Sequence, residues 1–261
     1  RFHGAEAAKV FSLIGMVRSL APLLAPAIGA FIIHFFHWEA IFIFLTLYAF
    51  IVAFFVYKDL PESYTYSKQN IIESYKIVLK HKIAIKAMLA LGFSFGGFFI
   101  IIAKTSFIYI EHFKIQTDYF PFFFGINFII LISMIKVNVS LLKKFNPVEL
   151  VKIAILIQTA AGILFVFNYE NIGLVTIVIL IAIYMSMMAF IFGNCMALAL
   201  EHFPKNAGVA SGVIGVLQFG LGAIISSIAL NFHNETFLPI ALSISVISFF
   251  AYLIMRTYKN V

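Results

Sequence analysis

The chain has 261 residues, of which 63% are hydrophobic and 11% charged, and its mean hydropathy is +1.05. A soluble domain carries about 25% charged residues, so this composition excludes a water-soluble globular protein. It predicts an all-α, polytopic membrane protein. The single cysteine, Cys195, excludes an intrachain disulfide framework. The sequence has no histidine pair with metal-ligand spacing, no Ser-His-Asp arrangement and no phosphate-binding or dinucleotide motif. We therefore expect neither an enzyme nor a bound metal or cofactor.

A membrane-spanning helix needs about 20 mainly apolar residues, and the chain contains about eight such runs. The first run contains Pro22 and Pro26, which would break a helix in water. A membrane tolerates them, because neighbouring helices satisfy the freed backbone groups. The small residues of this run make it thin on one side, so that another helix can approach closely. The predicted spans are 10–36, 40–57, 85–108, 119–142, 151–167, 172–200, 208–230 and 237–255.

Basic residues divide unequally between the two sides of the membrane. Successive spans cross in opposite directions, so the loops form two sets, and one set holds a single lysine, Lys114. The positive-inside rule therefore places both chain ends in the cytoplasm of a multi-pass protein, which we expect in a bacterial inner membrane. Topology explains the net charge of +7, so we expect the lipid bilayer, and not nucleic acid, as partner. The other set of loops and adjoining span ends holds Arg1, Lys9, Arg18, Lys58, Lys68, Lys76, Lys80, Lys82, Lys86, Lys136, Lys143, Lys144, Lys152, Lys205, Arg256 and Lys259.

The longest polar stretch divides the spans into two and six. It opens with Pro61 and its neighbours, which end a helix. Further on, Ile71, Tyr75, Val78 and Lys82 share one helical face, which predicts an amphipathic helix on the inner membrane surface. We accordingly expect three regions: two helices in 1–58, a cytoplasmic linker in 59–84 and a six-helix bundle in 85–261.

Four segments carry a resemblance to a known family. The first runs from Ala8 to Ala30 and is followed by Trp38-Glu-Ala-Ile-Phe42. The second is Leu60-Pro-Glu-Ser63, and the third is Lys143-Lys-Phe-Asn-Pro147. The fourth and most specific runs from Phe192 to Ala223. Through these segments the chain resembles the major facilitator superfamily, specifically the bicyclomycin-resistance type of drug/proton antiporters.

The resemblance implies a twelve-helix fold, of which this chain carries helices five to twelve. A preceding four-helix segment is then expected as a partner, and with it the acidic residue of the first helix that couples transport to protons. The first segment resembles the antiporter motif of helix five, a glycine ladder. In this chain two motif glycines are alanines, and Glu39 stands where the family usually has arginine. The ladder positions here are Ser12, Ala21, Ala25, Pro26, Gly29 and Ala30.

The resemblance implies that Pro22, Pro26 and Gly29 shape a hinge-like helix between two bundles, while ordinary helix packing by small residues is the alternative. In the most specific segment and the helix that follows it, Gly208, Gly212, Gly215 and Gly222 are predicted to pack helices closely.

Polar residues inside the spans are candidates for substrate or coupling sites. Arg18 and Lys104 carry charges within predicted spans, where function is the default hypothesis. The alternatives are that either side chain extends to the membrane surface, or that Arg18 pairs with a carboxylate of the preceding segment. Asn194 and Gln218 either bind substrate or bridge helices by hydrogen bonds. For Asn127 and Gln158 we expect bridging.

The resemblance implies proton-coupled efflux of small drugs or metabolites, powered by a proton gradient. Two alternatives stay open: an uptake symporter of the same fold, and a non-transporting remnant of a split or truncated gene. The 32 phenylalanines do not by themselves predict an aromatic pocket, because a general coding bias explains them. We expect Phe122 and Phe250, among others, to face lipid or pack.

Overall fold

The computed structural model describes residues 4–60, 70–169, 172–232 and 236–258, with the side chains of residues 23, 26 and 27 left aside. Arg1, the Pro61–Ser63 part of the family-like segment and the side chain of Pro26 lie outside this set. Every element described is helical. The elements are α1 Gly4–Phe35, α2 Glu39–Asp59, α3 Ile71–Lys80, α4 Lys82–Ser106, η1 Phe107–His112, η2 Thr117–Tyr119, α5 Phe120–Leu141, α6 Pro147–Asn168, α7 Leu174–Ser186, α8 Met188–Leu200, α9 Ala207–Gly215, η3 Val216–Leu221, α10 Gly222–Asn231 and α11 Leu238–Arg256.

The all-α, multi-pass architecture predicted from the sequence is confirmed. Seven helical segments of the described chain are long and apolar enough to cross a membrane, and they match the last seven predicted spans. The first predicted span lies in α1, which continues through Pro22 for 32 residues in all. Several boundaries differ by a few residues, and one span is divided. The predicted span 151–167 is extended to Pro147–Asn168, and the predicted span 172–200 is divided at Met187.

Local sequence explains where several helices begin. The side chain of Asn146 accepts a hydrogen bond from the backbone N–H of Val148 at 2.9 Å, and Pro147 follows at the first position of α6. Asn70 caps α3 in the same way, at 3.1 Å from the N–H of Ile72. Both residues satisfy backbone donors that a helix start leaves free.

The helices from α4 to α11 form a bundle whose centre is α4 and α8. Most residues of α4 and of α8 are buried. At the end of the bundle where α4 and α6 begin and α11 finishes, two lysines close the last turn of α11. Lys86 donates to the backbone oxygen of Thr257 at 2.9 Å, and Lys152 donates to that of Tyr258 at 3.1 Å. Because cations stabilise helix C-termini, these bonds fix α11 against its neighbours. We call this the basic end.

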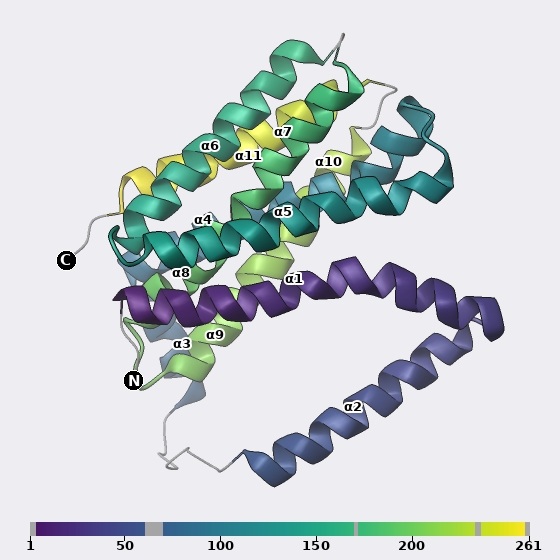
Figure 1. Cartoon of the computed structure of the whole chain (residues 1–261). Helices are drawn as coiled ribbons and strands as arrows, with labels where there is room; N and C mark the ends of the chain where they lie inside the picture. The colour runs from purple at the N-terminus through teal and green to yellow at the C-terminus, as the bar shows by residue number, and fades with distance from the viewer. Residues whose placement is uncertain (1–3, 61–69, 170–171, 233–235, 259–261) are drawn as a thin grey trace.

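The first two helices differ in their relation to the bundle. Figure 1 shows α1 running beside α5, with α2 turning back from the far end of α1 as an outlying helix. No residue of α2 is buried. By contrast, α1 packs on α5 and α8, so the contact between the first two helices and the bundle is made by α1.

The linker helix α3 lies against α4 and α9 at the basic end. Its buried residues are Ser74 and Val78, and the Ser74 hydroxyl lies 3.4 Å from the side-chain oxygen of Asn206. Of the predicted apolar face, Val78 is buried against the bundle while Ile71 and Tyr75 are exposed. The position of this helix on the inner membrane surface stays a prediction.

Candidate functional site

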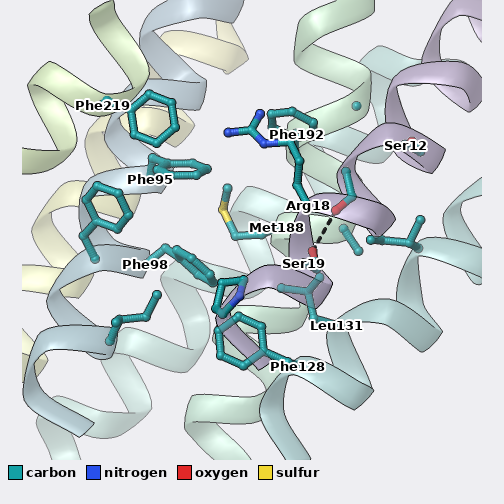
Figure 2. Close-up of a pocket in the computed structure, with 17 residues that line it drawn as sticks. Ser12, Arg18, Ser19, Phe95, Phe98, Phe128, Leu131, Met188, Phe192 and Phe219 are labelled. Atoms are coloured by element: carbon teal, nitrogen blue, oxygen red, sulfur yellow. Dashed lines mark hydrogen bonds between the residues drawn. The ribbon is translucent and has the colours of Figure 1, made fainter. Parts of the chain in front are cut away.

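A cavity of about 200 Å³ lies between α1 and the bundle. It is bounded by α1 on one side and by α4, α5, α8 and η3 on the others (Figure 2). The lining is almost wholly apolar and strongly aromatic. It consists of Ser12, Gly15, Arg18, Ser19, Pro22, Phe95, Phe98, Phe99, Ile102, Phe128, Leu131, Ile135, Met188, Ala189, Phe192, Gly193 and Phe219.

Phenylalanine rings from four elements form the aromatic lining. Three of them come from α4, where Phe95, Phe98 and Phe99 lie within one turn and so point to the same side of the helix. Phe219 from η3 meets Phe95 with ring centroids 5.5 Å apart, and Phe128 from α5 meets Phe98 at 6.3 Å. These edge-to-face arrangements fix the rings. Six of the 32 phenylalanines thus line one cavity, while coding bias stays an explanation for their overall number.

Arg18 is the one charged residue among the described residues that line the cavity. Its guanidinium carbon lies 4.8 Å from the ring centroid of Phe192 and 5.6 Å from that of Phe219. Cation–π contacts stabilise a cation by about 0.5–2 kcal/mol. A central arginine costs a membrane helix at least about 2.5–3.5 kcal/mol. The two contacts together are of the same order as this cost, and no carboxylate in the described parts of the chain pairs with Arg18.

Towards the basic end, a chain of buried polar side chains joins α1 to the bundle. Asn138 on α5 donates to the hydroxyl of Ser12 on α1 at 2.9 Å. Asn194 on α8 in turn donates to the side-chain oxygen of Asn138 at 3.1 Å. All three side chains are at most 1% exposed. Because hydrogen bonds between membrane helices contribute about 1 kcal/mol each, this Ser12–Asn138–Asn194 junction holds three helices together beside the cavity.

Two glycines bring α1 and α8 into close contact at the same level. A Cβ atom built on Gly193 would lie 2.6 Å from the backbone nitrogen of Ser12, and one built on Gly15 would lie 2.8 Å from the Phe192 ring. Each glycine therefore accommodates a residue of the opposite helix. Small residues drive membrane helices together by this kind of backbone approach.

Comparison with known proteins decides the family. The model of the family described as Major Facilitator Superfamily matches residues 1–227. The chain belongs to the Major Facilitator Superfamily.

Several curated members of the superfamily resemble this chain. A bicyclomycin resistance protein homolog from Haemophilus influenzae is 32% identical over 96% of this chain and 66% of its own length. An MFS-type transporter from Bacillus subtilis, YdgK, is 28% identical over 91% of this chain and 61% of its own length. The multidrug transporter MdfA of Escherichia coli is 35% identical over 35% of this chain and 24% of its own length. The chain thus spans about two thirds or less of the curated relatives that it matches.

The structure places the predicted motif residues of this superfamily member in different surroundings. Ser12 is in the junction, and Pro22 lines the cavity. Gly29 has no atom within 4 Å of a Cβ built on it. The remaining ladder positions whose side chains are described are exposed, and they are Ala21, Ala25 and Ala30. The role of Pro22, Pro26 and Gly29 in a hinge stays a prediction.

The predicted polar residues do not gather at one site. Lys104 is buried on α4, with its amine 5.7 Å from the ring centroid of Phe107, and it does not line the cavity. Asn194 bridges α8 to α5 as described. Gln218 is buried in η3 with no hydrogen-bond partner for its side-chain nitrogen. As expected, Gln158 bridges α6 to α7 by donating to the backbone oxygen of Tyr184 at 3.1 Å. Asn127 instead bonds within its own helix, to the oxygen of Phe123.

The four predicted packing glycines also differ. A Cβ on Gly222 would lie 3.0 Å from the Phe99 ring, whereas Gly208 and Gly215 have nothing within 4 Å and Gly212 has only the Tyr75 hydroxyl at 4.0 Å. The sequence reasoning did not single out Asn138, Gly15 or Gly193. Asn138 could have been identified from the sequence, because it is an amide near the end of a predicted span. In the membrane that position lies at the same depth as Ser12 and Asn194.

Proposed function

We propose that this chain forms part of a proton-driven exporter of small, mostly apolar compounds. The observation that carries the proposal is the cavity between α1 and the bundle, lined by six phenylalanines. Apolar, aromatic walls with few polar groups are typical of pockets for drug-sized ligands. The names of two relatives, a bicyclomycin resistance protein homolog and a multidrug transporter, support export over uptake.

The position of the cavity suits alternating access. Transporters of this kind rock one helical bundle against another around a central site. Here α1 lies across the cavity from α4, and the Ser12–Asn138–Asn194 junction closes the contact on the side of the basic end. The alternation of basic loops supports a cytoplasmic position for that end, in a bacterial inner membrane. Release of the junction would then open the cavity towards the cytoplasm.

Transport by energised inside-out membrane vesicles tests this proposal. A fluorescent lipophilic dye is added to the medium around vesicles from cells that express the chain. The vesicles are then energised by respiration. Export appears as dye uptake into the vesicle lumen, and a protonophore abolishes it. Release of dye on energisation would favour the uptake symporter. The same dye movement with and without the chain would favour the non-transporting remnant.

Two phenylalanines of α5 supply a matched pair of variants. Phe128 lines the cavity and is 1% exposed, whereas Phe122 is 73% exposed and does not line it. We expect Phe128→Ala to lower the transport rate at least about tenfold, because truncating a buried aromatic contact removes a large part of the binding energy. Phe122→Ala should transport as the parent does. Equal rates for the two variants would contradict a substrate site in this cavity.

A further inference from the structure

Arg18 gives the cavity a chemical preference that its aromatic walls do not explain. Its guanidinium is accessible and points towards Phe192 and Phe219 across the cavity (Figure 2). The two other polar side chains of the lining are already engaged. Ser12 accepts from Asn138, and Ser19 donates to the backbone oxygen of Gly15 at 2.8 Å.

The charge balance of the cavity wall is positive. Among the described lining residues there is one cation and no carboxylate. A guanidinium presents several N–H donors in a planar fork that matches a carboxylate. The aromatic rings line the same cavity as the guanidinium, and there they would contact a flat apolar body. An organic cation would be repelled by the positive charge of Arg18, because no carboxylate among the described lining residues compensates that charge.

From this arrangement we propose that Arg18 is the specificity-determining residue of the cavity and selects aromatic anions, such as carboxylates, over neutral and cationic analogues. The inference deepens the proposed function, since it names the substrate class of the same cavity. The carboxylate of the bound compound accepts hydrogen bonds from the guanidinium, while its ring packs among Phe95, Phe98 and Phe219. Binding then supplies the negative charge that the described part of the chain lacks at Arg18.

Three naphthalene compounds of nearly the same shape test the selection. These are 2-naphthoate, 2-naphthamide and 2-naphthylmethylammonium, which carry a negative, no and a positive charge. Their equilibrium binding to the full chain in lipid nanodiscs is measured by fluorescence without any ion gradient. We expect the carboxylate to bind about 10- to 100-fold more tightly than the amide, as a hydrogen-bonded charge pair implies. The ammonium compound should bind most weakly.

Variants at Arg18 separate its role from the shape of the cavity. Arg18→Gln should bring the carboxylate-to-amide affinity ratio to about one and leave amide binding within about threefold of the parent. Arg18→Lys should give an intermediate ratio, because it keeps the charge but loses the fork. Lys136→Gln removes a charge from the exposed side of α5 and should leave the ratio unchanged.

The outcomes are distinct. An equal affinity of the parent for carboxylate and amide would overturn the inference, and it is the result expected if a carboxylate from another segment pairs with Arg18. A ratio that survives Arg18→Gln, with amide binding retained, would also overturn it. If only the Arg18 variants lose the carboxylate-to-amide affinity ratio, the inference is supported. If the same chain moves no dye across the membrane of energised vesicles, that result counts against export and leaves the inference standing.

Discussion

The two halves of α1 differ in composition and in surroundings, because Glu6, Lys9 and Arg18 all lie in the first half while the second half is almost wholly apolar. In the first half Ala7, Ala8 and Ser12 are buried, at 7%, 0% and 1% exposure. In the second half the large side chains are accessible, including Leu24 at 51% and Phe31 at 65%. The more apolar second half is the one that does not pack, because an apolar side chain gains little by exchanging lipid for protein. What distinguishes the first half is a serine that finds a buried partner and a glycine that admits a neighbouring ring.

The helix α2 resembles the second half of α1. It has no buried residue and is apolar along its length. The described part of the chain therefore holds its first two helices through one contact region, which consists of the Ser12–Asn138–Asn194 junction and the close approach at Gly15 and Gly193. If this comparison is right, stability should depend on substitutions in the first half of α1 and its partners far more than on substitutions in the second half.

The largest effect on stability is expected from Gly193→Ala. The new methyl group would lie 2.6 Å from the backbone nitrogen of Ser12, and backbone cannot rotate away as a side chain can. We expect the free energy of unfolding in detergent to fall by about 1–3 kcal/mol, the usual cost of overpacking. Thermal unfolding followed by circular dichroism measures the change.

The matched control for Gly193→Ala is Gly29→Ala in the second half of α1. No atom lies within 4 Å of a Cβ at this position, and alanine favours a helix over glycine. Gly29→Ala should therefore leave the unfolding midpoint unchanged or raise it. If both variants are destabilised alike, the two halves of α1 do not differ in packing.

A smaller loss is expected from Asn138→Leu. Leucine removes both hydrogen bonds of the junction and leaves the Ser12 hydroxyl and the Asn194 amide without these partners. The expected loss is about 1–2 kcal/mol, since two hydrogen bonds between membrane helices are removed and each contributes about 1 kcal/mol or less. The control is Asn168→Leu, because Asn168 is exposed and bonds only to Leu164 of its own helix. A wild-type unfolding midpoint for Asn138→Leu would show that glycine packing alone holds α1.

The helices could be predicted from the sequence because their signals are local. The predicted span 237–255 compares with Leu238–Arg256, and 119–142 compares with Phe120–Leu141. Apolar runs give the length, while caps such as Asn146 with Pro147 give the start. The break at Met187 was missed, since an uninterrupted apolar run carries no sign of it. Ser186 donates to the backbone oxygen of Ile183 there, a local bond that competes with the helical pattern.

The cavity could not be predicted because helices that are apolar on every side do not reveal which face meets protein. Phe122 faces outward while Phe128 on the same helix faces the cavity, and hydropathy treats them alike. The π-helical turn η3 adds a second obstacle. An extra residue in a turn shifts the faces of the helix beyond it, so the helical spacing that relates Gly215 to Phe219 does not hold through η3.

The smallest effect concerns the loop that follows α8, the helix on which α1 packs. The ring of His202 stacks on that of His81 with centroids 4.5 Å apart, and this contact joins the end of α8 to the start of α4. Burial, together with the neighbouring His81, lowers the pKa of His202. The carboxylate of Glu201 acts in the opposite direction, but at 3.7 Å it lies beyond hydrogen-bond distance, so the effect of burial prevails.

A lowered pKa in the folded state means that the unfolded chain binds the proton more tightly. The contribution of His202 to stability is therefore complete above about pH 6.5, the ordinary histidine value, and is lost as the pH falls through the lowered pKa. We expect the unfolding midpoint to fall less between pH 7.5 and pH 5 in His202→Gln than in the parent. His202→Lys, which keeps a positive charge beside His81, should be less stable than His202→Gln at both pH values. An identical pH dependence in the parent and His202→Gln would show that protonation of His202 does not affect the stability of the fold.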